Sequence, residues 1–530
     1  MGALRALGVL GLLGMLGTVF LIAAGAATRP TLYVPARSGG WPGWLAGPFE
    51  GLGVGITPDR FQTLTLVMVA SYVAVLLAAR ALSGRMLWAT IIAAHLVLLL
   101  GPPLISQDVF GYLGFARLGV LHGLDPYTHF AAQAPGDPVY PFLGWPFQHS
   151  PYGPLFTLGS YALVPLGLAG GLWAFTAIAV AASLGAVALI ARAAGDEELS
   201  KNPSARVPGA AVGESRGFWT TLSGHSPRWA IAFVGLNPVL LVLAVGGAHN
   251  DLLQLLALAA ALALTAGAGP RFSDGAAALV AGVGVKVTAG LALPFLLLAP
   301  PRGHEPTTRP TAVSGGRAAD RRPRVADRRL RVAVGAVLSL ALLAVFALIG
   351  FGSHAFGFLS AVSEQQRLVA THSIPAETAR LVGLRGTPSW WRHCFVAGFV
   401  VVLAYALWRT LRGADWRVAA GWSTLALLLS TAWLLPWYAI WPLPLAAVSG
   451  DRRLRAATLL FCAYALLIHL PLADPLLSPR RVTCHTRKDC IPHGGHRRNH
   501  RVLRRGGGHH DHVHLTGLQV PGDVALDLRW

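Results

Sequence analysis

The sequence predicts an all-α protein that crosses a membrane many times, and three observations support this prediction. Of the 530 residues, 54% are hydrophobic and only 12% are charged, which is about half the charged fraction of a soluble globular domain. The mean hydropathy is positive, at +0.54. Many apolar stretches reach the roughly 20 residues that a helix needs to cross a bilayer. Because a helix satisfies its own backbone in lipid, we expect a bundle of about 11–13 transmembrane helices.

The apolar segments are the expected helices. The first begins with a single basic residue, Arg5, and its apolar run is too long for the core of a secretion signal, so we expect a retained anchor. The other segments follow without an internal repeat. The complete set is 4–27, 62–82, 86–105, 155–168, 171–192, 229–247, 250–268, 275–299, 332–351, 394–411, 418–435, 437–449 and 456–472.

The net charge of +20 is concentrated in loops beside apolar segments. Residues 300–331 carry nine arginines against three acidic residues, and smaller basic groups flank other segments. This distribution is typical of the positive-inside rule and argues against nucleic-acid binding, which needs a basic face on a folded domain. It predicts loops 106–150 and 353–391 on the outside. The side faced by residues 246–251 stays open, because the intervening segments fit either five crossings or three crossings and two re-entrant pieces.

Three polar stretches interrupt or follow the predicted helical domain, which spans residues 1–477. Residues 193–228 and 300–331 are predicted to be flexible loops. The tail from 478 to 530 is rich in arginine and histidine and is predicted to be disordered or translated out of frame; its HHDHVH run is a weaker candidate for metal binding. The four cysteines, Cys394, Cys462, Cys484 and Cys490, imply no disulfide framework.

The stretch SQDVFGYLGFARLGVLHGLDPYTH places a carboxylate, Asp108, just past an apolar segment. Ionisable residues at membrane depth are costly and therefore suggest function. A carboxylate at the wet edge of an apolar cavity is well placed as a general base. The alternative is that Asp108 only caps a helix. If the chain continues as a helix, Tyr112 shares a face with Asp108; the other polar candidates in this stretch are Gln107, Arg117, His122 and Asp125.

Further polar candidates interrupt later apolar segments. In HSPYGPL, His149 and Tyr152 lie in a proline-rich, non-helical loop, which lines either a pocket or a plain surface. In VGGAHND, residues His249, Asn250 and Asp251 offer more hydrogen-bonding groups than a tight turn needs, although a simple helical-hairpin turn is the alternative. Lys286 lies within an apolar run, where it either reaches an interface or pairs with an anion such as phosphate.

Two later regions add weaker candidates. Trp437 and Tyr438 lie beside prolines in LLPWYAIWPLPL, and they are explained equally well by an interfacial aromatic belt. The outer loop 353–391 holds several polar residues at spacings that single out none of them: His354, Glu364, Arg367, His372 and Arg380.

The motifs, taken in order, resemble a known family. SQDVFGYLGFARLGVLHGLDPYTH, HSPYGPL, NPVLLVLAVGGAHND, KVTAGLALPFLLL and PWYAIWPLPL follow one another as in the actinobacterial polyprenol-phosphate-mannose-dependent α-1,6-mannosyltransferases. These are membrane glycosyltransferases of the GT-C class, and the resemblance covers roughly residues 60 to 475.

The resemblance implies a function and roles for the candidates. It implies a GT-C-type helical bundle whose active site is formed by loops on the outer face of the plasma membrane. The donor would be polyprenyl-phosphate-mannose, the acceptor a lipid-linked mannan of the lipomannan core, and the reaction would invert the donor linkage. No cofactor is expected, and the acidic residues of the outer loops are too few to predict a divalent-ion site. Asp108 would act as the base, and Lys286 and Arg117 would be the best cations for the leaving phosphate. His149, His249, Asn250 and Asp251 would orient sugar or phosphate.

Other functions are alternatives to a mannosyltransferase. A lipid-linked sugar transporter or flippase also places charges in a membrane, but such proteins usually show an inverted repeat. A GT-C enzyme for a different sugar fits the same motifs. A membrane scaffold without activity would not need both Asp108 and the polar turn at 249–251.

Overall fold

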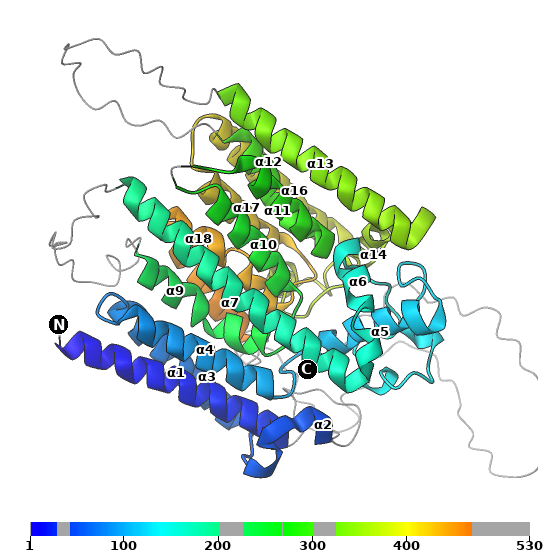
Figure 1. Cartoon of the computed structure of the whole chain (residues 1–530), viewed down its shortest axis with the longest axis horizontal. Helices are drawn as coiled ribbons and strands as arrows, with labels where there is room; N and C mark the ends of the chain where they lie inside the picture. The colour runs from blue at the N-terminus through cyan, green and yellow to red at the C-terminus, as the bar shows by residue number, and fades with distance from the viewer. Residues whose placement is uncertain (1, 29–42, 202–225, 268, 300–324, 469–530) are drawn as a thin grey trace, which may run out of the picture.

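The computed structural model describes residues 2–28, 43–201, 226–267, 269–299 and 325–468. Every regular element in these ranges is helical, which confirms the predicted fold class. Figure 1 shows the long helices α1 (Gly2–Thr28), α7 (Gly167–Lys201) and α13 (Val325–Phe351) crossing the view in a similar direction. The shorter helices α5 (Asp108–His122) and α6 (Pro154–Tyr161) gather at one end of the bundle, near α14 (Gly357–Gln365).

Most predicted segments form one helix each. Uninterrupted apolar runs without internal proline keep their backbone bonds inside the segment, which is what lipid requires. Besides α1, α7 and α13, these helices are α3 (Pro58–Ala78), α4 (Gly84–Leu100), α10 (Asp251–Leu264), α16 (Ser389–Leu411), α17 (Trp416–Ser430) and α19 (Arg452–Leu467).

Four predicted segments are broken, and there the prediction of a single helix was wrong. Segment 229–247 forms α9 (Pro227–Gly235) and the π-helix η6 (Val239–Val245), which are bent by 46° on either side of Asn237 and Pro238. Proline removes a backbone donor and bends helices. The other three broken segments also form more than one element. Segment 155–168 forms α6 and η4 (Val164–Leu166). Segment 275–299 forms α11 (Phe272–Val285), η7 (Val287–Ala292) and α12 (Leu293–Leu298), and segment 437–449 forms η9 (Pro436–Ile440) and α18 (Leu443–Ser449).

The breaks lower the number of helices long enough to span a membrane. The described residues contain five such helices, or six if the bent α9–η6 pair counts as one span, rather than the 11–13 predicted. Shorter apolar helices account for part of the difference, since α4, α10, α11 and the η7–α12 pair have 10–17 residues each. Non-helical backbone at membrane depth is tolerated where it is buried in protein or lines a cavity. The breaks in segments 275–299 and 437–449 border one pocket, and Asn237 at the α9–η6 break is buried.

The predicted loops are shorter than expected. Residues 193–201 continue α7, and residues 325–331 begin α13, so the loop boundaries at 193 and 331 were wrong. The loops predicted to lie outside also contain helices, namely α5, α14 and α15 (Ile374–Leu381). The remaining parts of both polar loops and the predicted tail from 478 to 530 lie outside the described residues.

Candidate functional site

Asp108 is the first residue of α5, and its carboxylate lines a pocket. The preceding backbone is unusual because Ile105 has a φ of 63°, a left-handed conformation that is rare for a β-branched residue. Ser106 Oγ accepts a hydrogen bond from Asp108 N at 3.1 Å. Gln107, not Asp108, occupies the cap position, so the interpretation of Asp108 as a simple cap was wrong.

His249 lies directly behind the Asp108 carboxylate. Its Nδ1 is 3.3 Å from Asp108 Oδ2, a close ionic contact rather than an aligned hydrogen bond. The ring stacks on Trp437 with centroids 3.8 Å apart, and it is 0% exposed. A side chain so enclosed acts on the carboxylate rather than on a ligand.

Backbone and side-chain contacts hold the 246–251 turn against the start of α5. Leu104 N donates to Gly246 O at 2.8 Å. Tyr112 Oη donates to Asn250 Oδ1 and accepts from Asn250 N, both at 3.3 Å. The turn therefore lies on the same side of the bundle as Asp108.

Asp251 holds Lys286 at a second break. Lys286 separates α11 from η7 in an extended conformation, and its Nζ donates to Asp251 Oδ1 at 2.8 Å. Trp441 Nε1 donates to the same oxygen at 2.7 Å. Asp251 is only 1% exposed, and its Oδ2 has no hydrogen-bond partner. The lysine is therefore held by a buried carboxylate.

Aromatic rings surround the lysine. Its Nζ lies 4.3 Å from the centroid of Tyr438 and 5.2 Å from that of Trp441, and those two rings stack at 4.4 Å. Cations are attracted to the faces of such rings. The HSPYGPL loop reaches the same place, because Gly153 N donates to Val285 O at 2.9 Å and brings Tyr152 into the wall.

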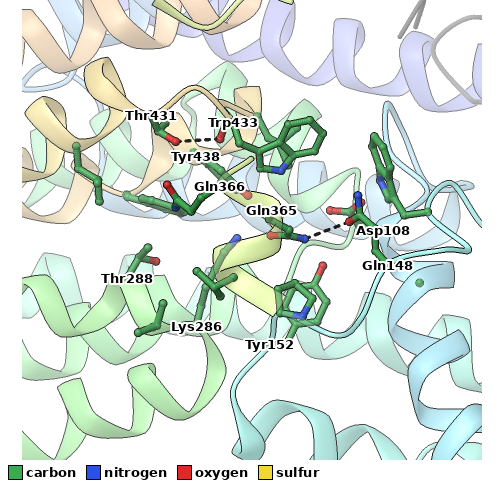
Figure 2. Close-up of a pocket in the computed structure, with 18 of the residues that line it drawn as sticks. Asp108, Gln148, Tyr152, Lys286, Thr288, Gln365, Gln366, Thr431, Trp433 and Tyr438 are labelled. Atoms are coloured by element: carbon green, nitrogen blue, oxygen red, sulfur yellow. Dashed lines mark hydrogen bonds between the residues drawn. The ribbon is translucent and has the colours of Figure 1, made fainter. Parts of the chain in front are cut away.

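One pocket brings the two charges together. Asp108 and Lys286 both line it, and Figure 2 shows them on opposite sides of the view, with Gln148 beside Asp108 and Thr288 beside Lys286. Of the sequence candidates, Tyr152 and Tyr438 also line this pocket. His249, Asn250, Asp251, Tyr112 and Trp437 lie behind it as supports.

The far end of α5 does not face the pocket. Arg117 Nε donates to Asp137 Oδ1 at 2.8 Å, and His122 Nε2 lies 2.9 Å from Asp137 Oδ2. The expectation that Arg117 serves the leaving phosphate is therefore not supported, since Arg117 is held by Asp137 away from the pocket and does not line it. His122 is likewise engaged in this cluster and lies outside the pocket.

The remaining candidates lie around the rim. Asp125 Oδ2 is 2.9 Å from His354 Nδ1, and His149 Nδ1 is 2.9 Å from Glu364 Oε2. These two pairs join loop 123–153 to the segment that follows α13. Gln107 is buried at the start of α5 and is not among the pocket residues.

Several pocket residues were missed by the sequence analysis. No motif distinguishes them from ordinary loop or helix residues, although the adjacent pair Gln365 and Gln366 stands out in the outer loop. They are Trp145, Gln148, Thr288, Gln365, Gln366, Thr431 and Trp433. Within the described ranges, no three His, Cys, Asp or Glu side chains are grouped to hold a metal ion. The pocket therefore offers one carboxylate as a base, one cation and a set of aromatic and amide groups.

Comparison with protein families gives two matches along the chain. A model described as "Alpha-(1->6)-mannopyranosyltransferase, N-terminal domain" matches residues 9–202 and 220–302. A model described as "MptB C-terminal domain" matches residues 385–484. No solved structure matches the chain.

Individual relatives agree with the family models. Alpha-(1->6)-mannopyranosyltransferase A of Mycobacterium tuberculosis is 28% identical over 406 residues, covering 71% of this chain and 67% of the relative. The protein of the same name from Corynebacterium glutamicum is 30% identical over 211 residues, covering 39% of this chain and 37% of the relative. A probable alpha-(1->6)-mannopyranosyltransferase of Mycolicibacterium smegmatis is 35% identical over 115 residues, covering 19% and 20% respectively.

Proposed function

The chain belongs to the alpha-(1->6)-mannopyranosyltransferase family of membrane glycosyltransferases, and on that premise we propose that it transfers mannose from polyprenyl-phosphate-mannose to a lipid-linked mannan acceptor. The product would be an α-1,6 linkage of the lipomannan core. The single observation that supports this most directly is that one pocket holds both a carboxylate and a lysine. A base and a cation are what the attacking alcohol and the leaving phosphate each require.

In the proposed reaction, Asp108 takes the proton from an acceptor hydroxyl. The hydroxyl oxygen attacks the anomeric carbon of the donor mannose. The bond between that carbon and the phosphate oxygen breaks, and its electron pair leaves with the polyprenyl phosphate. Attack from the face opposite the leaving group inverts a β-linked donor into an α-linked product.

Lys286 would stabilise the negative charge of the departing phosphate. Its Nζ is held by Asp251 at 2.8 Å and lies over two aromatic rings, so its position is fixed before the donor arrives. Fixed charges lower a barrier because they need no reorganisation during the reaction. His249 supports Asp108 from behind and acts as a positioning residue, a narrower role than orienting sugar or phosphate.

We also propose that the pocket opens toward the outer face of the plasma membrane. Loops 106–150 and 353–391 are both predicted outside from the basic loops that flank the other ends of the segments. The pairs Asp125–His354 and His149–Glu364 join these two loops, so they lie on one side of the bundle.

The test uses membranes containing the full chain, polyprenyl-phosphate-[¹⁴C]mannose and a synthetic α-1,6-linked alkyl dimannoside. Wild type should label the acceptor, and linkage analysis should give an α-1,6 bond. Asp108→Asn should lower the rate at least about 10²-fold, as expected for removal of a general base. A donor that carries glucose tests the alternative sugar.

A matched control separates loss of the base from loss of charge at a helix start. Asp59 also lies in the first turn of a helix, α3, but it is exposed and outside the pocket. Asp59→Asn loses the same interaction with a helix dipole and should keep near-normal transfer. Near-normal transfer by Asp108→Asn would refute the assignment of the base.

A further inference from the structure

Two glutamine side chains meet at the rim of the pocket from segments far apart in the sequence. Gln365, at the end of α14, donates from Nε2 to Gln148 Oε1 at 3.4 Å (Figure 2). Their sequence neighbours, Glu364 and His149, also pair, with His149 Nδ1 2.9 Å from Glu364 Oε2. The amide contact is at the long limit for a hydrogen bond, so a ligand can replace it at little cost.

Two tryptophan rings accompany these amides. Trp145 and Trp433 line the same pocket and meet edge to face, with centroids 5.4 Å apart. Trp433 is buried and Trp145 is half-buried. Thr431 Oγ1 donates to the backbone oxygen of Trp433 at 3.4 Å, at the same part of the pocket (Figure 2).

The chemistry of this group fits a neutral polyhydroxylated ligand. Each glutamine amide both donates and accepts hydrogen bonds without carrying charge, as sugar hydroxyls require. The indole rings present apolar faces with negative potential, against which the C–H groups of a pyranose pack. Phosphate would find its cation elsewhere, at Lys286, which Figure 2 shows on the side of the view away from Gln148 and Asp108.

We propose that Gln148, Gln365, Trp145 and Trp433 form the subsite for the acceptor sugar, which they hold with one hydroxyl at Asp108. This inference rests on the proposed function and adds a division of the pocket. The acceptor ring occupies the amide and tryptophan side, and the donor phosphate occupies the lysine side. The donor mannose is also a neutral sugar, so the experiment must distinguish the two.

Steady-state kinetics in membranes separate the two sugars. With the alkyl dimannoside as acceptor, Gln365→Leu should raise the acceptor KM about 5- to 10-fold, as expected for one lost hydrogen bond. Trp145→Ala should raise it at least about 10-fold. The donor KM should stay within about twofold in both variants, because neither residue would contact the donor. Gln62→Leu, a glutamine of α3 outside the pocket, should change neither constant.

The opposite pattern of changes in acceptor KM and donor KM would overturn the inference. If either variant raises the donor KM and leaves the acceptor KM unchanged, the group serves the donor sugar. If both constants stay unchanged, the group binds neither. The conservative variants Gln365→Asn and Trp145→Phe guard against misfolding, because each keeps part of the binding chemistry and should lie between wild type and the disruptive variant.

A second measurement does not depend on turnover. A photoreactive alkyl dimannoside, cross-linked in wild-type membranes and mapped by mass spectrometry, should mark residues 145–148 or 365, and excess dimannoside should compete. Labelling confined to other segments would reject the subsite even if transfer occurs. Absence of mannose transfer in wild type, with competed labelling at this subsite, would reject the proposed function and leave the sugar site standing.

Discussion

The two ends of helix α5 carry similar polar residues but place them in opposite situations. At its start, Asp108 opens onto the pocket with His249 as its close neighbour. At its far end, Arg117 and His122 close on Asp137, whose Oδ1 also accepts from Val139 N at 2.9 Å. Behind the pocket, both His249 ring nitrogens and Asp251 Oδ2 lack hydrogen-bond partners.

This difference indicates that the start of α5 serves the proposed reaction and that its far end stabilises the fold. Buried polar groups in proteins are normally hydrogen-bonded, so the Asp137 cluster is a structural solution that ties a loop to a helix. The pocket end leaves hydrogen-bonding capacity unused at His249 and Asp251, directly behind Asp108 and Lys286. Substitutions at the two ends should therefore affect different measurements.

The largest effect on turnover beyond Asp108 should come from the lysine. Changing Lys286 alone would strand the buried Asp251 carboxylate, which costs about 3–5 kcal/mol of stability. We therefore pair Lys286→Gln with Asp251→Asn, which preserves an acceptor for Trp441 Nε1. The double variant should fold and lose about 10²-fold in transfer rate, measured with saturating donor. Transfer within threefold of wild type would remove Lys286 from the mechanism.

A smaller loss should follow from the residue behind the base. His249→Gln removes the ring that lies against the carboxylate, and we expect the turnover number to fall about 10-fold while both substrate KM values stay near wild type. Asn250 offers a comparison, since its side chain contacts Tyr112 instead of Asp108. A rise in donor KM without a fall in turnover would place His249 in contact with substrate.

The far end of α5 should behave in the reverse manner. Asp137→Asn breaks a largely buried ion pair with Arg117 and should cost about 3 kcal/mol in unfolding free energy. Transfer activity per folded molecule should remain within about twofold, since the cluster lies outside the pocket. Thermal unfolding of the detergent-solubilised protein measures the first quantity. A large loss of activity in well-folded Asp137→Asn would contradict the conclusion that the far end of α5 has only a structural role.

The smallest expected effect is on the stability of the protein at acidic pH. Burial acts to raise the pKa of Asp137, but hydrogen bonds from Arg117, Val139 N and His122 outweigh it and hold the pKa below its usual value. The stabilising contribution is therefore complete above about pH 4, the unfolded value, and is lost as the pH falls through the folded pKa. Wild type should lose its stability advantage over Asp137→Asn only below about pH 4. An advantage that shrinks near neutral pH would contradict this.

The sequence was a good guide to helices and a poor guide to their breaks. Run 171–192 is apolar throughout and became part of α7, whereas run 275–299 has a similar hydropathy but breaks at Lys286. The break depends on a partner, Asp251, 35 residues earlier. Hydrophobic periodicity reports the local period of a segment and carries no information on such distant pairs.

The prediction of site residues was limited in the same way, because it could not include distant partners. Asp108, His249 and Asp251 could be found because each interrupts an apolar run, where charge is expensive. Arg117 looked equally promising until Asp137 was seen beside it. Gln148 and Gln365 carry no charge and lie in loops where polar residues are common, so their meeting at the pocket required the fold.

The main-chain bond from Leu104 N to Gly246 O has a practical consequence. It ties the segment that leads into Asp108 to the turn that carries His249 and Asp251, through atoms that every amino acid except proline supplies on the donor side. Substitution of either side chain would not isolate this bond, because Leu104 is buried and a Cβ at Gly246 would lie 2.7 Å from Leu104 Cδ1. Replacement of the Leu104 amide by an ester, through chemical synthesis or nonsense suppression, would show how strongly one peptide group aligns the proposed base with the lysine.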